Sequence, residues 1–177
     1  KFHRLGRTSF RQTRRARGYV AERRHISWLY QSRLAAEREY EVMKRIYLRK
    51  VSVPEPIARN RHVVVMGLIE GTELRYAEIE EPIPTFKEVI ANIRRTYLNA
   101  GIIHADLSEF NILIKPDGGI LIIDWPQAII KDHPDAERLL TRDVENILYF
   151  FRKRYGLAYS LEDVLSYVKG EKRRIRT

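Results

Sequence analysis

HADLSEFN, at residues 104–111, is the stretch from which the fold and the chemistry of this sequence follow. It places the carboxylate of Asp106 five residues before the amide of Asn111. Another acid, Asp124, comes directly after a short apolar run. The turn PDGG at residues 116–119 separates two apolar segments, which predicts a β-hairpin. Asn111 and Asp124 are therefore expected at the two ends of one tight hairpin, where they can share a metal ion.

This pattern favours phosphoryl transfer. The reaction needs a carboxylate that orients or deprotonates the nucleophile, and oxygen ligands that hold Mg²⁺ against the phosphates. The order His-x-Asp, four residues, Asn, strand, Asp is that of protein kinases. We therefore predict Asp106 and Asp124 as catalytic residues, Asn111 and Asp124 as ligands of Mg²⁺ or Mn²⁺, and ATP as the phosphoryl donor.

A kinase site also requires a strand lysine paired with a helix glutamate, which together position the phosphates. Lys1 is the only lysine in a strand-like segment before the first predicted helix, residues 34–48. Within that helix Glu39 shares the apolar stripe, whereas Glu37 and Glu41 are offset from it. We predict a pair between Lys1 and Glu39, with Glu37 as the alternative partner.

The order of predicted elements indicates an α+β fold, a trimmed two-lobed protein-kinase-like fold. Residues 1–66 are expected to form a partial N-lobe, with a small sheet and one helix. A hinge is expected at residues 67–71, followed by a mainly helical C-lobe with the catalytic hairpin at residues 72–177.

The hinge is the expected contact for the adenine edge of ATP. Met66, Gly67 and Ile69 lie between a buried strand, predicted at residues 63–66, and a polar linker. Backbone groups of this segment can therefore meet the nucleotide. Pro54 and Pro56 are interpreted as a connection that precedes the strand.

Three helices are predicted in the C-lobe. Thr85 is expected to cap one of them, with Glu88 at the capping-box position. Another spans residues 135–155 and ends at Gly156, and Ser160 opens a short last helix.

The net charge of +10 is concentrated at the two ends of the sequence. Residues 1–33 carry ten Lys or Arg against the single acid Glu22, and five more follow from Lys169 against Glu171. Such a basic arm and tail favour a polyanionic partner such as nucleic acid, although a solvated basic surface would have the same composition. Residues 7–33 are predicted to form a flexible loop.

Several classes of protein are disfavoured by composition. The sequence contains no cysteine, so disulfides and thiolate metal sites are excluded within it. Its apolar runs are too short to span a bilayer, and no secretory signal is expected, since no apolar core follows the basic start. We expect a soluble cytoplasmic protein, and its oligomeric state is not indicated.

Together these residues resemble one family, the atypical RIO protein kinases, and within it the second subfamily. The similarity lies in KFHRLGRTSF at residues 1–10, in residues 104–111, in IDWPQ at residues 123–127, in residues 133–134 and in residues 139–151. It covers both ends and the middle of the sequence.

The resemblance implies specific roles. Lys1 would bind phosphate, Asp106 would be the catalytic Asp, and Asn111 and Asp124 would bind the metal. It also implies transient phosphorylation of Asp124, which would make the protein an ATPase switch. Family members act in maturation of the small ribosomal subunit, so the implied partners are the pre-ribosomal small subunit and its rRNA, bound through the basic arm and tail.

The family pattern also includes a Gly-rich loop before the lysine and an N-terminal winged-helix domain, neither of which is within these 177 residues. Thr8 and Ser9, close to Lys1, are the predicted self-phosphorylation sites. Two other readings stay open: a small-molecule phosphotransferase of the aminoglycoside or choline kinase type, and an RNA-binding kinase-like scaffold without turnover.

Overall fold

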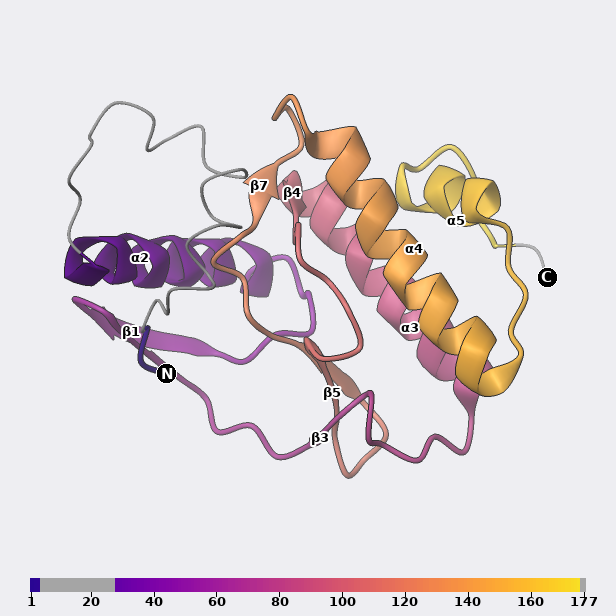
Figure 1. Cartoon of the computed structure of the whole chain (residues 1–177), viewed down its shortest axis with the longest axis horizontal. Helices are drawn as coiled ribbons and strands as arrows, with labels where there is room; N and C mark the ends of the chain where they lie inside the picture. Colours follow the sequence, from indigo (N-terminus) through magenta and orange to yellow (C-terminus); the bar gives the residue numbers. More distant parts are fainter. Residues whose placement is uncertain (4–27, 176–177) are drawn as a thin grey trace.

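The computed structural model describes residues 1–3 and 28–175. Its architecture is α+β, with one helix above a small antiparallel sheet at one side and a group of packed helices at the other (Figure 1). The expected arm of residues 4–27, with Thr8 and Ser9, lies outside the described residues. Within the described part no helix is both long enough and apolar enough to cross a membrane.

The first described helix, α2 (Trp28–Tyr47), packs against the sheet of the N-terminal part. The prediction that it begins at Leu34 was wrong by six residues, and residues 28–33 are helical rather than part of a loop. This first stretch of the helix buries two polar side chains, Gln31 and Ser32, and leaves Leu29 exposed. An apolar stripe is therefore missing where the helix begins, so the hydrophobic pattern could not show it.

Strands β1 (Pro56–Asn60) and β2 (Val63–Met66) form an antiparallel pair beneath α2. The prediction of β2 is confirmed, but β1 had been interpreted as a connection. Most of the side chains of β1 are exposed or half-buried, and Pro56 stands at its first position, where a strand tolerates proline. Residues 1–3 continue the sheet through a bridge between Phe2 and Val63.

The predicted hairpin is confirmed by β5 (Ile112–Ile114) and β6 (Ile120–Ile122), which pair in antiparallel register. Gly118 in the turn has φ of 79°, a conformation that glycine adopts without a steric penalty. A short strand, β3 (Thr72–Glu73), pairs with the other edge of β5 and was not predicted. Two residues are too few for a periodic signal.

A second small pairing brackets the hairpin in sequence. Strands β4 (Ile102–Ile103) and β7 (Ile129–Ile130) are antiparallel. They bring the start of the segment that contains Asp106 close to the end of the segment that contains Asp124. The segments that carry Asp106 and Asp124 are therefore held next to each other in the C-terminal half.

Helix α3 (Pro82–Arg95) continues into a π-helical segment, Thr96–Ala100. The predicted cap at Thr85 was wrong, because the helix begins earlier, with proline in its first turn, where no backbone donor is required. The Thr85 hydroxyl donates instead to the carbonyl of Glu81, the residue before the helix, at 2.9 Å. Glu88 accepts hydrogen bonds from Asn92 and Arg95 rather than closing a capping box.

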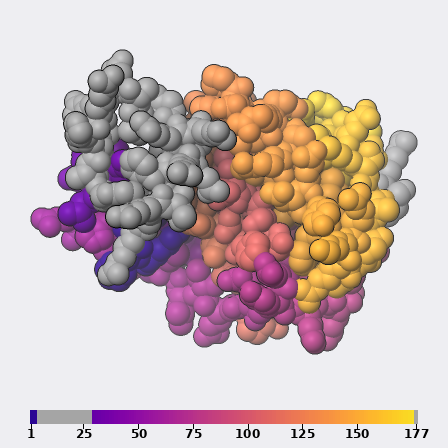
Figure 2. Space-filling view, in the orientation of Figure 1, coloured from indigo at the N-terminus to yellow at the C-terminus, as the bar shows by residue number. Residues whose placement is uncertain are grey.

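The last two helices follow the prediction closely. Helix α4 (Ala136–Tyr155) ends at Gly156, which has φ of 69°, and α5 (Leu161–Val168) starts after Ser160. Helices α3, α4 and α5 pack on one another, and the space-filling view shows α4 in orange next to α5 in yellow (Figure 2). Their buried side chains join those of the hairpin in one core, whose largest fully buried members include Trp125, Phe86, Phe151, Met43 and Ile46.

Candidate active site

The loop between β4 and β5 carries the predicted catalytic Asp106, and α4 fixes its backbone. Ala105 has φ of 64°, a left-handed conformation that is uncommon for a residue other than glycine. Its N–H donates to Asp143 Oδ2 at 2.7 Å, and its carbonyl accepts from Arg142. The N–H of Leu107 donates to Asp143 Oδ1 at 3.0 Å. Hydrogen bonds on both sides of Asp106 thus hold the loop in this shape.

Asp143 is almost fully buried, with 1% of its surface exposed. Burial raises its pKa to about 7, although the two backbone hydrogen bonds and the charge of Arg142 oppose that rise. Each oxygen of its carboxylate accepts one hydrogen bond from a backbone N–H of the catalytic loop. Among the described residues, no other donor lies within hydrogen-bonding distance of this carboxylate. Sequence reasoning did not assign it a role.

Asp106 and Asn111 are linked through the loop backbone. The side-chain amide of Asn111 donates to the backbone carbonyl of Asp106 at 2.7 Å. The Asp106 residue is exposed, but the atoms packed around its carboxyl partly desolvate it, which raises its pKa above the ordinary value; the charge of Arg142 opposes that rise and that of Asp124 adds to it. A carboxylate with a raised pKa accepts a proton more readily than a free one, which suits a base near neutral pH.

Asp124 follows β6 and adopts φ of 68°, which turns the chain sharply at the end of the strand. The preceding Ile123 donates its N–H to the carbonyl of Asn111 at 2.9 Å, so the two predicted metal ligands lie at adjacent backbone positions across the hairpin. The Asp124 carboxylate accepts a hydrogen bond from Lys1 Nζ at 2.5 Å and is 43% exposed.

The predicted pair between Lys1 and Glu39 is confirmed, with Nζ 2.6 Å from Oε1. Glu39 is 1% exposed, whereas Glu37 pairs with Arg59 at the surface and Glu41 is exposed. Burial alone would lower the pKa of Lys1, but the charges of Glu39 and Asp124 raise it above its ordinary value. The lysine therefore remains a cation between two carboxylates.

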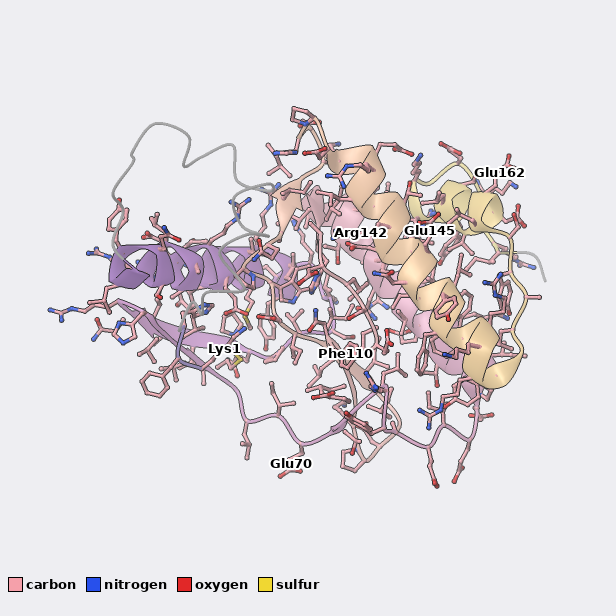
Figure 3. All side chains as sticks on the ribbon, in the orientation of Figure 1. Lys1, Glu70, Phe110, Arg142, Glu145 and Glu162 are labelled. Carbon is pink, nitrogen blue, oxygen red and sulfur yellow. The ribbon has the colours of Figure 1, made fainter. Side chains whose placement is uncertain are left out.

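A cavity of about 520 Å³ lies between these groups and the predicted hinge. Lys1, labelled below α2 in Figure 3, is on its wall, and the remaining lining is chiefly apolar. The cavity is within the size range of small-molecule sites. Its lining includes all the predicted nucleotide and metal residues but not Asp106; the members are Lys1, Glu39, Met43, Pro54, Met66, Gly67, Leu68, Ile69, Asn111, Ile123 and Asp124.

The groups on this wall fit a divalent cation that prefers oxygen ligands. The amide nitrogen of Asn111 is engaged by Asp106, which leaves the side-chain oxygen as an acceptor, and Asp124 offers a half-exposed carboxylate. Within residues 1–3 and 28–175, no group of three His, Asp or Glu side chains could hold a metal ion by itself. The pair thus fits Mg²⁺ only together with further oxygen ligands, such as phosphates.

His104, the first residue of the catalytic motif, is buried and supports the structure of the site. Its Nε2–H donates to the Ile123 carbonyl at 3.0 Å, and its ring lies 4.4 Å from that of Trp125. Burial lowers its pKa to about 4, so the imidazole is neutral at physiological pH. Its role is therefore to link the catalytic loop to the segment that ends in Asp124.

Sequence reasoning missed four residues that build the site: His3, Arg142, Asp143 and Asn146. Asn146 donates to the Leu107 carbonyl at 2.9 Å, and His3 contacts Glu39. The helical spacing of Arg142, Asp143 and Asn146 puts polar residues next to the buried stripe of α4, which was the available signal. For His3 the signal was its position two residues after Lys1, on the same face of an extended segment.

Comparisons with known proteins agree with this geometry. A family model described as RIO domain matches residues 1–164. The chain is 48% identical over 159 residues to the RIO-type serine/threonine-protein kinase Rio2 of Methanocaldococcus jannaschii, covering 86% of this chain and 58% of that relative. It is 41% identical over 161 residues to the serine/threonine-protein kinase RIO2 of Saccharomyces cerevisiae, covering 87% of this chain and 38% of the relative.

Solved structures give the same result. The Rio2 kinase of Chaetomium thermophilum superposes with a TM-score of 0.74 at 38% identity, over 92% of this chain and 53% of that one. Its complex with ADP, Mg²⁺ and phosphoaspartate superposes with a TM-score of 0.72 at 32% identity, over 96% of this chain and 53% of the other. The trimmed kinase-like fold is thereby confirmed. The chain spans about half the length of the relatives that it matches.

Proposed function

Since this chain belongs to the RIO domain family, we propose that it is the catalytic part of a RIO-type serine/threonine kinase of the second subfamily, which transfers the γ-phosphoryl group of ATP. The higher identity to Rio2 than to Rio1 relatives, 48% against 36%, supports the subfamily. The family match favours this function over a small-molecule phosphotransferase.

The observation that carries the proposal is the position of Lys1. Its ammonium group lies between the buried Glu39 and the half-exposed Asp124, on the wall of the cavity. Glu39 holds the cation in place, and the contact with Asp124 brings it to the predicted metal ligand. A phosphate group bound by Lys1 would therefore meet the oxygen ligands of Asn111 and Asp124.

ATP is expected in the cavity, with its adenine edge on the backbone of Met66, Gly67 and Ile69. Asn111 and Asp124 would hold Mg²⁺, or Mn²⁺ in its place. The metal would neutralise phosphate charge that develops during transfer. Lys1 binds phosphate oxygens, and the apolar lining of the cavity excludes water from the purine.

Two acceptors are consistent with the site. In transfer to a serine hydroxyl, Asp106 would accept the proton of that hydroxyl as its oxygen bonds to phosphorus and ADP leaves. In the ATPase cycle, a carboxylate oxygen of Asp124 would bond to the γ-phosphorus of ATP as ADP leaves, and water would then hydrolyse the acyl phosphate to inorganic phosphate and the free carboxylate. The phosphoaspartate complex of the Chaetomium relative supports the second route.

The test is ATP consumption by the full-length protein with and without Mg²⁺. We expect turnover that requires the metal and that falls by at least about a hundredfold in Asp106→Ala, the range for removal of a catalytic base. A phosphoenzyme that is cleaved by hydroxylamine would identify the acyl phosphate route, and phosphoserine would identify self-phosphorylation. A wild-type protein that binds RNA but consumes no ATP would establish the scaffold alternative.

We further propose that the partners are the pre-ribosomal small subunit and its rRNA, in the cytoplasm. Support comes from the charge of the arm and of the tail. Part of the charge of the tail is used internally, because Lys169 pairs with Glu137 and Lys172 with Asp163. Arg173 and Arg174 are exposed and are the better candidates in the described part of the tail.

Salt dependence tests the RNA proposal. Changing five arginines of the arm to glutamine should weaken RNA binding and reduce the slope of log affinity against log salt, by roughly 0.7 for each lost contact with single-stranded phosphate. An unchanged slope would assign the charge to solubility. The variant Lys169→Gln, whose ammonium is already paired with Glu137, is the matched control and should leave the slope almost unchanged.

A further inference from the structure

Residues 1–3 form an extended segment at the edge of β2. Lys1 exchanges backbone hydrogen bonds with Val64, and the N–H of His3 donates to the His62 carbonyl at 2.8 Å. Side chains alternate along such a segment. Accordingly Phe2 is 68% exposed, whereas Lys1 and His3 both face α2, where they meet Glu39. One short strand thus places two donors on the same carboxylate.

Those donors bind different oxygens of Glu39. His3 Nε2 donates to Oε2 at 2.5 Å, and Lys1 Nζ donates to Oε1 at 2.6 Å. The backbone N–H of Trp125 also donates to Oε1, at 3.2 Å. The imidazole and the carboxylate are both buried, with 7% and 1% of their surfaces exposed. Each oxygen of the carboxylate therefore has its own donors: Oε2 accepts from His3, and Oε1 accepts from Lys1 and Trp125.

The contact with His3 fixes the orientation of the Glu39 carboxylate, which the contact with Lys1 alone does not fix. An ammonium group is a compact charge on a flexible stem, and it attracts a carboxylate without fixing its orientation. Lys1 is also shared with Asp124, so its pull on Glu39 is divided. An imidazole on a strand is rigid and binds in one direction. If Oε2 lost that donor, a buried oxygen would be left unsatisfied and the carboxylate could rotate.

We propose that His3 is a positioning residue for phosphoryl transfer: it holds the Glu39 carboxylate so that Oε1 faces both Lys1 and the backbone next to Asp124. This inference rests on the kinase function proposed above. Through Trp125, Glu39 connects the phosphate-binding lysine to the segment that carries the predicted metal ligand. His3 would act on both through this one carboxylate.

The electrostatics of Glu39 agree with this geometry. Burial would raise the pKa of its carboxyl, but the hydrogen bond from His3, followed by the charge of Lys1, holds that pKa below the ordinary value. Glu39 therefore remains an anion within the core. An anion there needs donors on both oxygens, and His3 is the described donor to Oε2.

The test compares Mg²⁺-dependent ATP turnover of the full-length protein in His3→Phe and His3→Gln. Phenylalanine preserves the ring without the donor, and glutamine preserves an N–H donor near the position of Nε2. We expect His3→Phe to lower kcat on the order of tenfold. The rate is divided by the concentration of active sites, which is measured by nucleotide binding, so that unfolded protein does not count as a loss of kcat. His3→Gln should restore most of the lost rate.

A double-mutant cycle separates positioning from a general contribution to folding. In a Glu39→Gln background, His3→Phe should cause little further loss of kcat, because the group through which it acts is already gone. The matched control is Phe2→Gln, on the opposite face of the same strand, which should leave kcat unchanged.

The possible outcomes are distinct. Equal rates for His3→Phe and His3→Gln, or losses that add fully in the Glu39→Gln background, would overturn the positioning role alone. A wild-type protein without turnover would overturn the kinase function and this inference together. Rescue by glutamine combined with a non-additive cycle would establish it.

Discussion

Lys1, Glu39 and Asp124 meet through charged side chains from three distant segments, whereas the loop around Asp106 is held by backbone groups bound to one helix, α4. The first set, the charged junction, is partly exposed: Lys1 is 33% and Asp124 43% exposed at the side chain. The second set, the catalytic loop of residues 104–111, binds an almost fully buried carboxylate, Asp143.

The difference follows from what each region has to do. The partly exposed ion pair of Lys1 and Asp124 contributes little free energy, and Lys1 can exchange that partner when a phosphate or a metal ion arrives, while the buried Glu39 keeps it in place. Buried backbone donors cannot lose their acceptor without a large penalty. The charged junction is thus suited to binding and release, and the catalytic loop is suited to keeping one shape. The guanidinium of Arg38 on α2 also donates to the Ala128 carbonyl at 2.6 Å, which links α2 to the segment that follows Asp124.

The strongest test of this comparison is Asp124→Ala. Loss of the carboxylate removes the predicted metal ligand and the partner of Lys1, so ATP turnover should fall by about a thousandfold. The free energy of unfolding should fall by only about 1–2 kcal/mol, because the side chain is half-exposed and its ion pair is screened, and the main cost is that of placing alanine at the positive φ of 68°. Denaturant unfolding beside a turnover assay checks both. A loss of stability as large as that of a core variant would show that Asp124 belongs with the rigid region.

His104 provides a pH test of the rigid region. Its pKa is lowered from 6.5 to about 4 in the folded protein, so the unfolded chain binds the extra proton first. The stability that it contributes is complete above pH 6.5 and is lost as the pH falls through about 4. At about 1.36 kcal/mol for each pH unit, the loss is about 3 kcal/mol. Unfolding titrations between these pH values measure it.

The matched variant for that experiment is His104→Gln, which keeps a donor for the Ile123 carbonyl but does not titrate. Asp143 has the opposite effect, because its pKa is raised to about 7 and its contribution declines as the pH rises through that value. The difference between wild type and His104→Gln isolates the histidine. An identical pH dependence in the two proteins would mean that the imidazole is not buried as a neutral ring.

Asp143→Asn tests the rigidity of the catalytic loop, and its expected effect is intermediate between those of the other variants. The N–H groups of Ala105 and Leu107 bind different oxygens of Asp143, and the substitution replaces one of those oxygens by an NH2 donor, so one backbone N–H would lose its acceptor. We expect about 2 kcal/mol of lost stability and a parallel drop in turnover, since the loop would leave its strained shape. Glu145→Gln, on the exposed face of the same helix, is the control. Loss of turnover without loss of stability would contradict the proposed rigidity.

The smallest expected effect is that of Glu39→Gln in the charged junction. Lys1 would keep a neutral acceptor and its contact with Asp124, so turnover should fall only about tenfold and the fold should persist. Kinetics and thermal unfolding of this variant should be compared with Glu37→Gln and Glu41→Gln, which should behave as wild type. An effect of Glu37→Gln equal to that of Glu39→Gln would show that burial at position 39 is unimportant for the pair.

Much of the site could be predicted because its signals are local. The spacing of Asp106, Asn111 and Asp124 around a turn with glycine at Gly118 predicts both the hairpin and the shared metal position. The stripe of α2 selects Glu39 over Glu37 because a helix repeats every 3.6 residues. The same periodicity predicts α4 and its end at Gly156.

Other features depend on contacts between segments far apart in sequence. Short elements such as β3 and β7 contain too few residues for a pattern, and they form because a neighbouring strand offers free backbone groups. Helix α2 begins at Trp28 although its first turns carry no apolar stripe, since tertiary packing buries Gln31 and Ser32 instead. Propensity alone could not show either.

The sequence by itself determined which side chains are candidates for the proposed phosphoryl transfer and which helix and hairpin carry them. Only the tertiary structure decided what holds those side chains in place. Asp143 reaches Ala105 across 38 residues, and His3 reaches Glu39 across 36. The physical reason is that hydrogen bonds act over about 3 Å in space, without regard to distance along the chain. The chemical role of a side chain can thus be predicted from the local sequence, whereas its orientation depends on contacts that form only when the chain folds.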